Sequence, residues 1–317
     1  MLRVVPVLFV LMLCTAASAQ PAVWQPAQGH VQMPLWPGTA PDPQPLPGAE
    51  TMKTSDPAGK LIGGKTVVSV TNVSVPTMTV YAPTAPNTGA AVVVFPGGGF
   101  EILAMDLEGT EVCDWLVARG VTCVLLKYRV PSIPYRWQTN RRPHNREVPV
   151  PSLQDAQRAL RLVRAHASEW GVDPRKVGVI GFSAGGYLVA EASTQYVKHW
   201  YARVDAADDQ SARPDFALAI YPGHLVDNKG VFNRNVPVTK DTPPTFLLQA
   251  EDDPVDSVDE SRAYYTALKQ AGVPAEMHLY AHGRHAFGLR PTKEPITHWP
   301  ALAETWLHTI GVLPAQD

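Results

Sequence analysis

Cysteine is scarce in this sequence, and neither sign of charge is in excess. The 317 residues include 3 cysteines, and 27 lysines and arginines nearly balance 29 aspartates and glutamates, for a net charge of -2. Such few and widely spaced cysteines do not form the clusters that bind zinc. A near-neutral chain also lacks the basic surface that attracts nucleic acids. We therefore expect neither a metal site nor a nucleic-acid partner.

Long hydrophobic runs are missing as well. The apolar stretch at residues 4–13 is too short to cross a bilayer. Arg3 precedes this stretch, and the small residues Ala17, Ser18 and Ala19 follow it. This order is typical of a secretory signal peptide. We therefore predict that residues 1–19 are cleaved off, that the mature protein is periplasmic or secreted, and that it has no membrane partner.

Cleavage after residue 19 would leave two cysteines in the mature chain. Cys113 lies in a helical pattern and Cys123 lies inside an apolar, strand-like run. In an oxidising compartment the two thiols could form a disulfide. Two separate buried thiols fit the pattern equally well, so the sequence leaves this choice open.

Proline, in contrast, is abundant, and it clusters outside the apolar runs. The chain has 31 prolines, and residues 20–64 form an irregular N-terminal arm in which Trp24 and Trp36 stand alone. We expect these tryptophans to hold the arm against the surface of the remaining domain, residues 65–317. Residues 65–70 and 77–82 alternate between β-branched and other side chains, which predicts antiparallel strands at a sheet edge.

Short apolar runs alternate with amphipathic segments along the rest of the chain. The expected strands are residues 90–95, 121–126, 177–180, 216–221, 245–250 and 275–280, and the expected helices are 108–119, 153–170, 184–193, 261–271 and 297–310. Strands that alternate with helices predict a mainly parallel sheet with helices on both faces. The fold class is therefore α/β, as one domain.

The run Gly-Phe-Ser-Ala-Gly at residues 181–185 joins an expected strand to an expected helix. A strand, a sharp turn with a strained serine and a helix form the nucleophile elbow of serine hydrolases. Glycines flank the serine because side chains there would collide with the neighbouring strand and helix. Ser183 is therefore the candidate nucleophile.

A second glycine run follows the expected strand at residues 90–95. Consecutive glycines leave backbone N–H groups uncovered, and such groups can stabilise an oxyanion. We expect the amides of Gly98, Gly99 and Ala184 to act as the donors.

An activated serine needs a base, and the base needs a carboxylate that orients it. His282 and His285 share the loop after the last strand, and Gly283 and Gly288 should let His285 reach the serine. Among the acids Glu251, Asp252 and Asp253, we favour Asp253, with Asp252 as the alternative. His144 lies in a proline-rich, basic loop at residues 131–151 and is expected to be exposed.

Six short motifs occur in order between residues 90 and 313. They are Pro-Gly-Gly-Gly-Phe at 96–100, Lys-Tyr-Arg at 127–129, Gln-Asp-Ala at 154–156, Gly-Phe-Ser-Ala-Gly-Gly at 181–186, Asp-Pro-Val at 253–255 and His-Ala-Phe-Gly at 285–288. In these motifs the chain resembles the α/β-hydrolase superfamily, and within it the exported acetyl esterases of the acetylxylan-esterase and feruloyl-esterase-like kind. Pro96 and Tyr187 stand where lipase-like relatives usually have histidine.

The resemblance implies an α/β-hydrolase fold and a serine carboxylesterase without a cofactor. It implies Ser183 as nucleophile, His285 as base, Asp253 as acid, and Gly98, Gly99 and Ala184 as oxyanion donors. The expected substrates are acetyl esters of xylan or related plant polysaccharides. The alternatives are a feruloyl or aryl esterase, a prolyl-type peptidase and an inactive homologue that binds carbohydrate.

Overall fold

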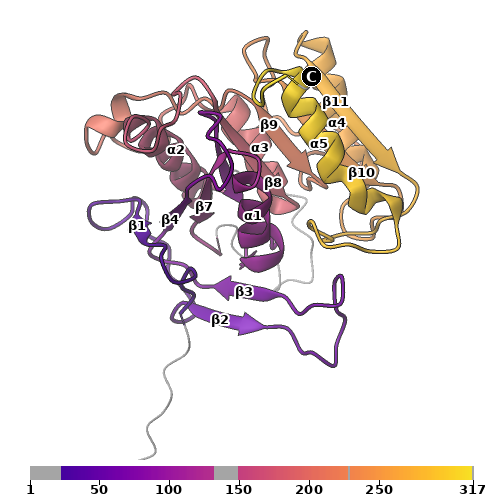
Figure 1. Ribbon diagram of the computed structural model, residues 1–317, viewed down its shortest axis with the longest axis horizontal. Coiled ribbons are helices and arrows are strands. Elements are labelled where there is room, and N and C mark those ends of the chain that lie inside the picture. Colours follow the sequence, from indigo (N-terminus) through magenta and orange to yellow (C-terminus); the bar gives the residue numbers. More distant parts are fainter. Residues whose placement is uncertain (1–22, 132–148, 228, 316–317) are drawn as a thin grey trace, which may run out of the picture.

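The computed structural model describes residues 23–131, 149–227 and 229–315. The predicted signal peptide and His144 lie outside the described residues. An eight-stranded sheet forms the centre of the molecule, in the order β1-β4-β7-β5-β8-β9-β10-β11 (Figure 1). Its strands are β1 Gln32–Pro34, β4 Thr77–Tyr81, β5 Ala91–Phe95, β7 Thr122–Lys127, β8 Val177–Phe182, β9 Ala217–Ile220, β10 Thr245–Ala250 and β11 Ala275–Tyr280.

The neighbouring strands from β7 to β11 all pair in parallel, whereas β4 pairs with β7, and β1 with β4, in antiparallel fashion. Every residue of β5, β7, β8, β9 and β10 is buried. A parallel sheet that is covered on both faces requires such continuous apolar strands. The expected α/β-hydrolase architecture is therefore confirmed.

Helices lie between the parallel strands along the chain, and a last one follows β11. They are α1 Glu111–Val117, α2 Val150–Ala165, α3 Ala184–Thr194, α4 Val258–Gln270 and α5 Trp299–Thr309, with the short segments η1 Asp106–Thr110, η2 Ala206–Asp209 and η3 Pro295–His298. The chain moves from β5 to β7 in one direction along the sheet and returns from β7 to β8 in the other. Because such crossovers are right-handed, α1 and α2 cover opposite faces.

The N-terminal arm is more regular than we expected. Its strand β1 lies outside β4, so β4 is not an edge strand. A second sheet contains β2 Thr51–Thr54, β3 Val68–Thr71 and β6 Ile102–Ala104. The expected strand at residues 65–70 is therefore shorter and belongs to this second sheet. Alternating side chains predict that a segment forms a strand, but tertiary contacts determine which strand it pairs with.

Trp36 holds the arm against the domain, as we expected. Its indole Nε1 donates to Oδ1 of Asp155 at 2.9 Å, and Arg129 Nε lies 2.9 Å from Oδ2 of the same carboxylate. Arg158 Nε donates to the carbonyl of Leu35 at 2.9 Å. Arg129 and Asp155, from two of the motifs noted above, thus connect the arm to α2.

A disulfide joins Cys113 of α1 to Cys123 of β7. The structure therefore decides between the two states that the sequence left open. Among the described residues, no helix has both the length and the apolar character that a bilayer crossing needs.

Candidate active site

Ser183 occupies a sharp turn between β8 and α3. Its backbone angles are φ 53° and ψ -119°, which a residue with a side chain rarely adopts. A Cβ atom on Gly181 would lie 2.2 Å from the carbonyl oxygen of Gly185, and one on Gly185 would lie 2.1 Å from that of Phe95. Only glycine fits at both positions, because the turn brings strand and helix backbones into contact.

Ser183, His285 and Asp253 form a continuous hydrogen-bonded chain. His285 Nε2 lies 2.9 Å from Ser183 Oγ, and His285 Nδ1 lies 2.6 Å from Asp253 Oδ2. A carboxylate can only accept, so the imidazole proton belongs on Nδ1 and Nε2 accepts from the serine hydroxyl. The three side chains come from the loops after β8, β10 and β11, at the carboxyl edge of the sheet, where ligands of such sheets bind.

Asp253, and not Asp252, is the carboxylate beside His285. The Asp253 side chain is fully buried. Its Oδ1 accepts from the amides of Val255 and Asp256 at 2.8 and 3.1 Å, and Gln249 Nε2 donates to Oδ2 at 3.1 Å. These donors fix the orientation of the carboxylate.

The alternative residues lie next to the site with different contacts. Asp252 Oδ1 accepts from the amides of Gly283 and Arg284 at 2.9 and 2.7 Å. The His282 side chain is 72% exposed, and its Nδ1 lies 3.4 Å from Asp252 Oδ2. Asp252 thus supports the backbone of the loop that carries His285, a role that the sequence did not reveal.

Three carboxylates set the electrostatics around His285. Burial alone would lower the pKa of this imidazole, but the hydrogen bond that His285 donates to Asp253 and the charges of Asp256, Asp253 and Glu108 raise it above its ordinary value. Asp256 Oδ2 lies 3.8 Å from His285 Nε2, on the side of the serine. Sequence analysis missed Asp256, because nothing in its spacing separates it from an ordinary loop aspartate.

The glycine run after β5 lies against the serine. A Cβ atom on Gly97 would lie 3.1 Å from Ser183 Cβ. The Gly97 amide donates to Glu108 Oε2 at 2.8 Å. Within the described chain, the amides of Gly98, Gly99 and Ala184 donate no hydrogen bond, so they can serve a ligand.

Glu108 and Tyr221 are further polar residues at the site that sequence analysis missed. The Tyr221 hydroxyl lies 2.8 Å from Glu108 Oε1, and both side chains are buried. A signal for Glu108 did exist, because helical spacing places it on the apolar side with Val112, Trp115 and Leu116. Tyr221 ends an apolar strand run, where polar groups often serve a site.

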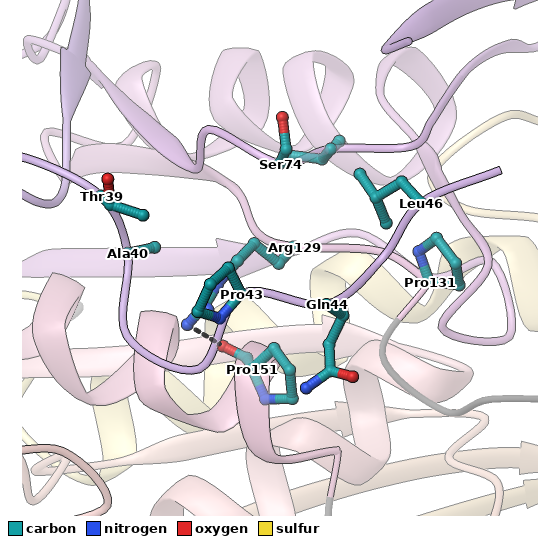
Figure 2. A pocket seen from close by; sticks show the side chains of 10 residues that line it. Thr39, Ala40, Pro43, Gln44, Leu46, Ser74, Arg129, Pro131 and Pro151 are labelled. Carbon is teal, nitrogen blue, oxygen red and sulfur yellow. Dashed lines mark hydrogen bonds between the residues drawn. The ribbon is translucent and has the colours of Figure 1, made fainter. Parts of the chain in front are cut away.

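A small cavity of about 40 Å³ lies between the arm and the domain (Figure 2). Its walls are Thr39, Ala40, Pro43, Gln44, Leu46, Val73, Ser74, Arg129, Pro131 and Pro151. Arg129 crosses its floor and donates to the carbonyl of Pro151 at 3.0 Å. Ser183, His285 and Asp253 do not line this cavity. Within the described ranges, no cluster of three or more potential ligands could hold a metal ion.

Residues 78–220 match the BD-FAE family. An acetylxylan esterase of Xylanibacter ruminicola is 28% identical over 235 residues, which are 67% of this chain and 43% of that protein. A versiconal hemiacetal acetate esterase of Dothistroma septosporum is 30% identical over 258 residues, which are 69% of this chain and 72% of that protein. The chain spans only a third to about half of the first curated relatives that it matches.

A solved structure gives a longer match. The acetyl ester-xyloside bifunctional hydrolase from Caldicellulosiruptor lactoaceticus superimposes with a TM-score of 0.67 at 30% identity. The match covers 89% of this chain and 97% of that one.

Proposed function

The chain belongs to the α/β-hydrolase superfamily and resembles its acetylxylan esterases, and from this premise we propose that it is a secreted or periplasmic serine carboxylesterase. The observation that carries the proposal is the hydrogen-bonded chain from Ser183 through His285 to Asp253, with distances of 2.9 and 2.6 Å. This arrangement is the one that activates a hydroxyl for attack on a carbonyl.

The first half of the reaction transfers the acyl group to the enzyme. His285 Nε2 takes the proton of Ser183 as Oγ attacks the ester carbonyl carbon. Asp253 holds the imidazole and stabilises the positive charge that forms. The amides of Gly98, Gly99 and Ala184 stabilise the oxyanion, helped by the N-terminus of α3. Nε2 then gives its proton to the leaving alcohol.

The second half returns the enzyme to its starting state. Water loses a proton to His285 Nε2 and attacks the acyl-serine carbonyl. A second oxyanion forms at the same donors and collapses. Nε2 returns its proton to Ser183 Oγ, and the carboxylic acid leaves.

We propose acetyl groups on xylan or a related polysaccharide as the substrate. The support comes from the names of the relatives, an acetylxylan esterase and an acetyl ester-xyloside hydrolase. The sequence of residues 131–151 is polar and basic and offers no apolar lid for long acyl chains. Chain-length profiling with nitrophenyl esters should therefore peak at acetate, and a peak at long chains would contradict the proposal.

Export is supported by the leader pattern and by the disulfide. Disulfides persist in oxidising compartments and are rare in the cytosol. Fractionation of cells that express the full chain should recover the protein, shortened by residues 1–19, outside the cytosol. Full-length protein in the cytosol would contradict this part of the proposal.

The deciding experiment measures acetate release from acetylated xylan beside hydrolysis of nitrophenyl acetate, for the wild type and for Ser183→Ala. Serine-dependent release from both substrates would support a polysaccharide deacetylase. Activity on the small ester alone would redirect the search to feruloyl or other aryl esters. Near-normal turnover by Ser183→Ala would overturn the mechanism, and a fluorophosphonate that does not label Ser183 would favour an inactive homologue.

A further inference from the structure

The steps above leave Glu108 without a role, although it is a buried acid beside the site. It lies in η1, directly before α1, and only 2% of its surface is exposed. Gly97 N lies 2.8 Å from Oε2, and the Tyr221 hydroxyl lies 2.8 Å from Oε1. Each oxygen therefore has its own donor.

The proton count identifies the carboxylate as an acceptor on both sides. The Gly97 amide can only donate. The Tyr221 hydroxyl already accepts from the amide of Gly288 at 3.1 Å, so its own proton is left to give to Glu108. A protonated Glu108 would leave one hydroxyl hydrogen in this buried group without an acceptor, which is costly.

These contacts connect two loops that are far apart in the sequence. Gly97 belongs to the glycine run that precedes the expected oxyanion donors. Gly288 belongs to the loop that carries His285, and the Tyr221 ring lies edge-on to the imidazole with 5.0 Å between ring centres. Glu108 and Tyr221 therefore form a buried bridge between the donor loop and the base.

The bridge also lies next to the nucleophile. A Cβ atom on Gly97 would lie 2.5 Å from Glu108 Oε2 and 3.1 Å from Ser183 Cβ. The Gly97 amide donates to Glu108, whereas the amides of Gly98 and Gly99 donate to no group among the described residues. The carboxylate thus holds the first amide of the run, and its charge acts on the imidazole of His285.

We infer that Glu108 and Tyr221 act together as a positioning pair, which sets the glycine run and the imidazole relative to Ser183 and stabilises the protonated His285 that forms in each half-reaction. This role depends on the proposed function, because it concerns the same serine. Neither residue needs to touch the substrate. The pair supports the reaction through Gly97, Gly288 and the charge on the imidazole.

Several ionisable groups surround His285 and Glu108, and the test must separate the effect of Glu108 on His285 from the effects of the others. Asp253, Asp256 and Glu108 act on His285, and each raises the pKa of its imidazole. Burial raises the pKa of Glu108 above its ordinary value and the charge of Asp106 adds to this rise, while the hydrogen bonds from Tyr221 and Gly97 and the charge of His285 offset it only in part. Loss of the Glu108 charge should therefore lower the pKa of His285 while Asp253 and Asp256 stay in place.

The experiment uses the full-length protein with Glu108→Gln, Tyr221→Phe and the double variant. Glu108→Gln keeps the shape and an acceptor for Gly97 but removes the charge. Glu191→Gln is the matched control, because Glu191 is an equally buried glutamate, in α3, without contacts to Gly97 or His285. Two readouts need no turnover: the rate of Ser183 labelling by a fluorophosphonate, and the His285 pKa from a proton NMR titration.

We expect Glu108→Gln and Tyr221→Phe each to slow labelling and kcat by about tenfold. The double variant should lose less than the product of the two effects, because the residues act as a unit. The His285 pKa should fall in Glu108→Gln and stay unchanged in Glu191→Gln.

An unchanged His285 pKa and wild-type labelling in Glu108→Gln would overturn the inference. If Glu108→Gln does not fold, Tyr221→Phe alone tests the inference. Its rate of Ser183 labelling must still fall, and a wild-type rate would overturn the inference. A wild type that is labelled at Ser183 but hydrolyses no ester would defeat the proposed function only. The NMR titration would still test the positioning pair in that case.

Discussion

Glu108 and Glu191 are equally buried glutamates in two different regions of the molecule. At the site, Glu108 accepts from Gly97 and Tyr221, and it acts on His285. In the helix α3, neither carboxyl oxygen of Glu191 has a partner with hydrogen-bond geometry among the described residues. Burial raises the pKa of Glu191 well above its usual range, and the hydroxyl of Tyr187 offsets this only in part.

The comparison shows that burial of an acid does not by itself indicate a role in chemistry. Burial raises the pKa of both carboxyls, but donors favour the charged form of Glu108, whereas Glu191 without such donors favours the protonated form. Glu108 lies where a charge can act on the base. Glu191 lies in the helix that supports the nucleophile, where a charge would only cost stability. We therefore expect some substitutions to change activity at the site and others to change only the stability of the surrounding fold.

The largest effect should come from the acid at the site. Asp253→Asn should lower kcat by about 10⁴-fold, because an amide favours the wrong imidazole tautomer. Asp252→Asn is the matched control, since an asparagine oxygen can still accept from Gly283 and Arg284. Steady-state kinetics on nitrophenyl acetate measures both. A larger loss in the Asp252 variant would reverse the assignment.

The disulfide should affect the stability of the fold and have little effect on activity at the site. Cys113 and Cys123 are separated by 10 positions, and opening a loop of this size costs about 3 kcal/mol of unfolding free energy. We expect the double alanine variant to lose about this much in urea denaturation, while kcat changes only a few-fold. A collapse of kcat in protein that is still folded would show that α1 serves the site directly.

Glu191→Gln should stabilise the protein at alkaline pH by about 2 kcal/mol. The folded pKa of Glu191 lies above its unfolded value, so its contribution is most favourable below the unfolded pKa. That contribution falls as pH rises toward the folded pKa, and then it levels off. Denaturation of both proteins between pH 5 and pH 9 tests this, and equal pH profiles would contradict it.

The smallest effect should come from Asp256. Its charge raises the pKa of His285, so Asp256→Asn should move the acid limb of kcat/KM to lower pH. The rate on the plateau should change only a few-fold, because Asp253 and Glu108 remain. A pH–rate profile from pH 4 to pH 9 measures the shift, and a move to higher pH would rule out this electrostatic role.

Much of the fold was predictable, because local patterns carry it. Continuous apolar runs become strands when both sheet faces are covered, and β5, β7, β8, β9 and β10 all show this. The pairing of β3 in the second sheet and of β1 with β4 was not predictable, because the alternation of side chains does not indicate which strand a segment pairs with. The arm, held by Trp36 and Asp155, similarly depends on contacts between distant residues.

The sequence by itself determined the α/β class, the strained turn around Ser183 and the loop that supplies the histidine. These features depend only on short stretches of chain, so glycine spacing and apolar periodicity are enough to predict them. Only the tertiary structure places Asp253, and not Asp252, beside His285, joins the two cysteines in a disulfide, and brings Glu108 and Tyr221 together next to these residues. Ser183 and His285 are 102 positions apart, and only the parallel sheet brings their loops to one edge.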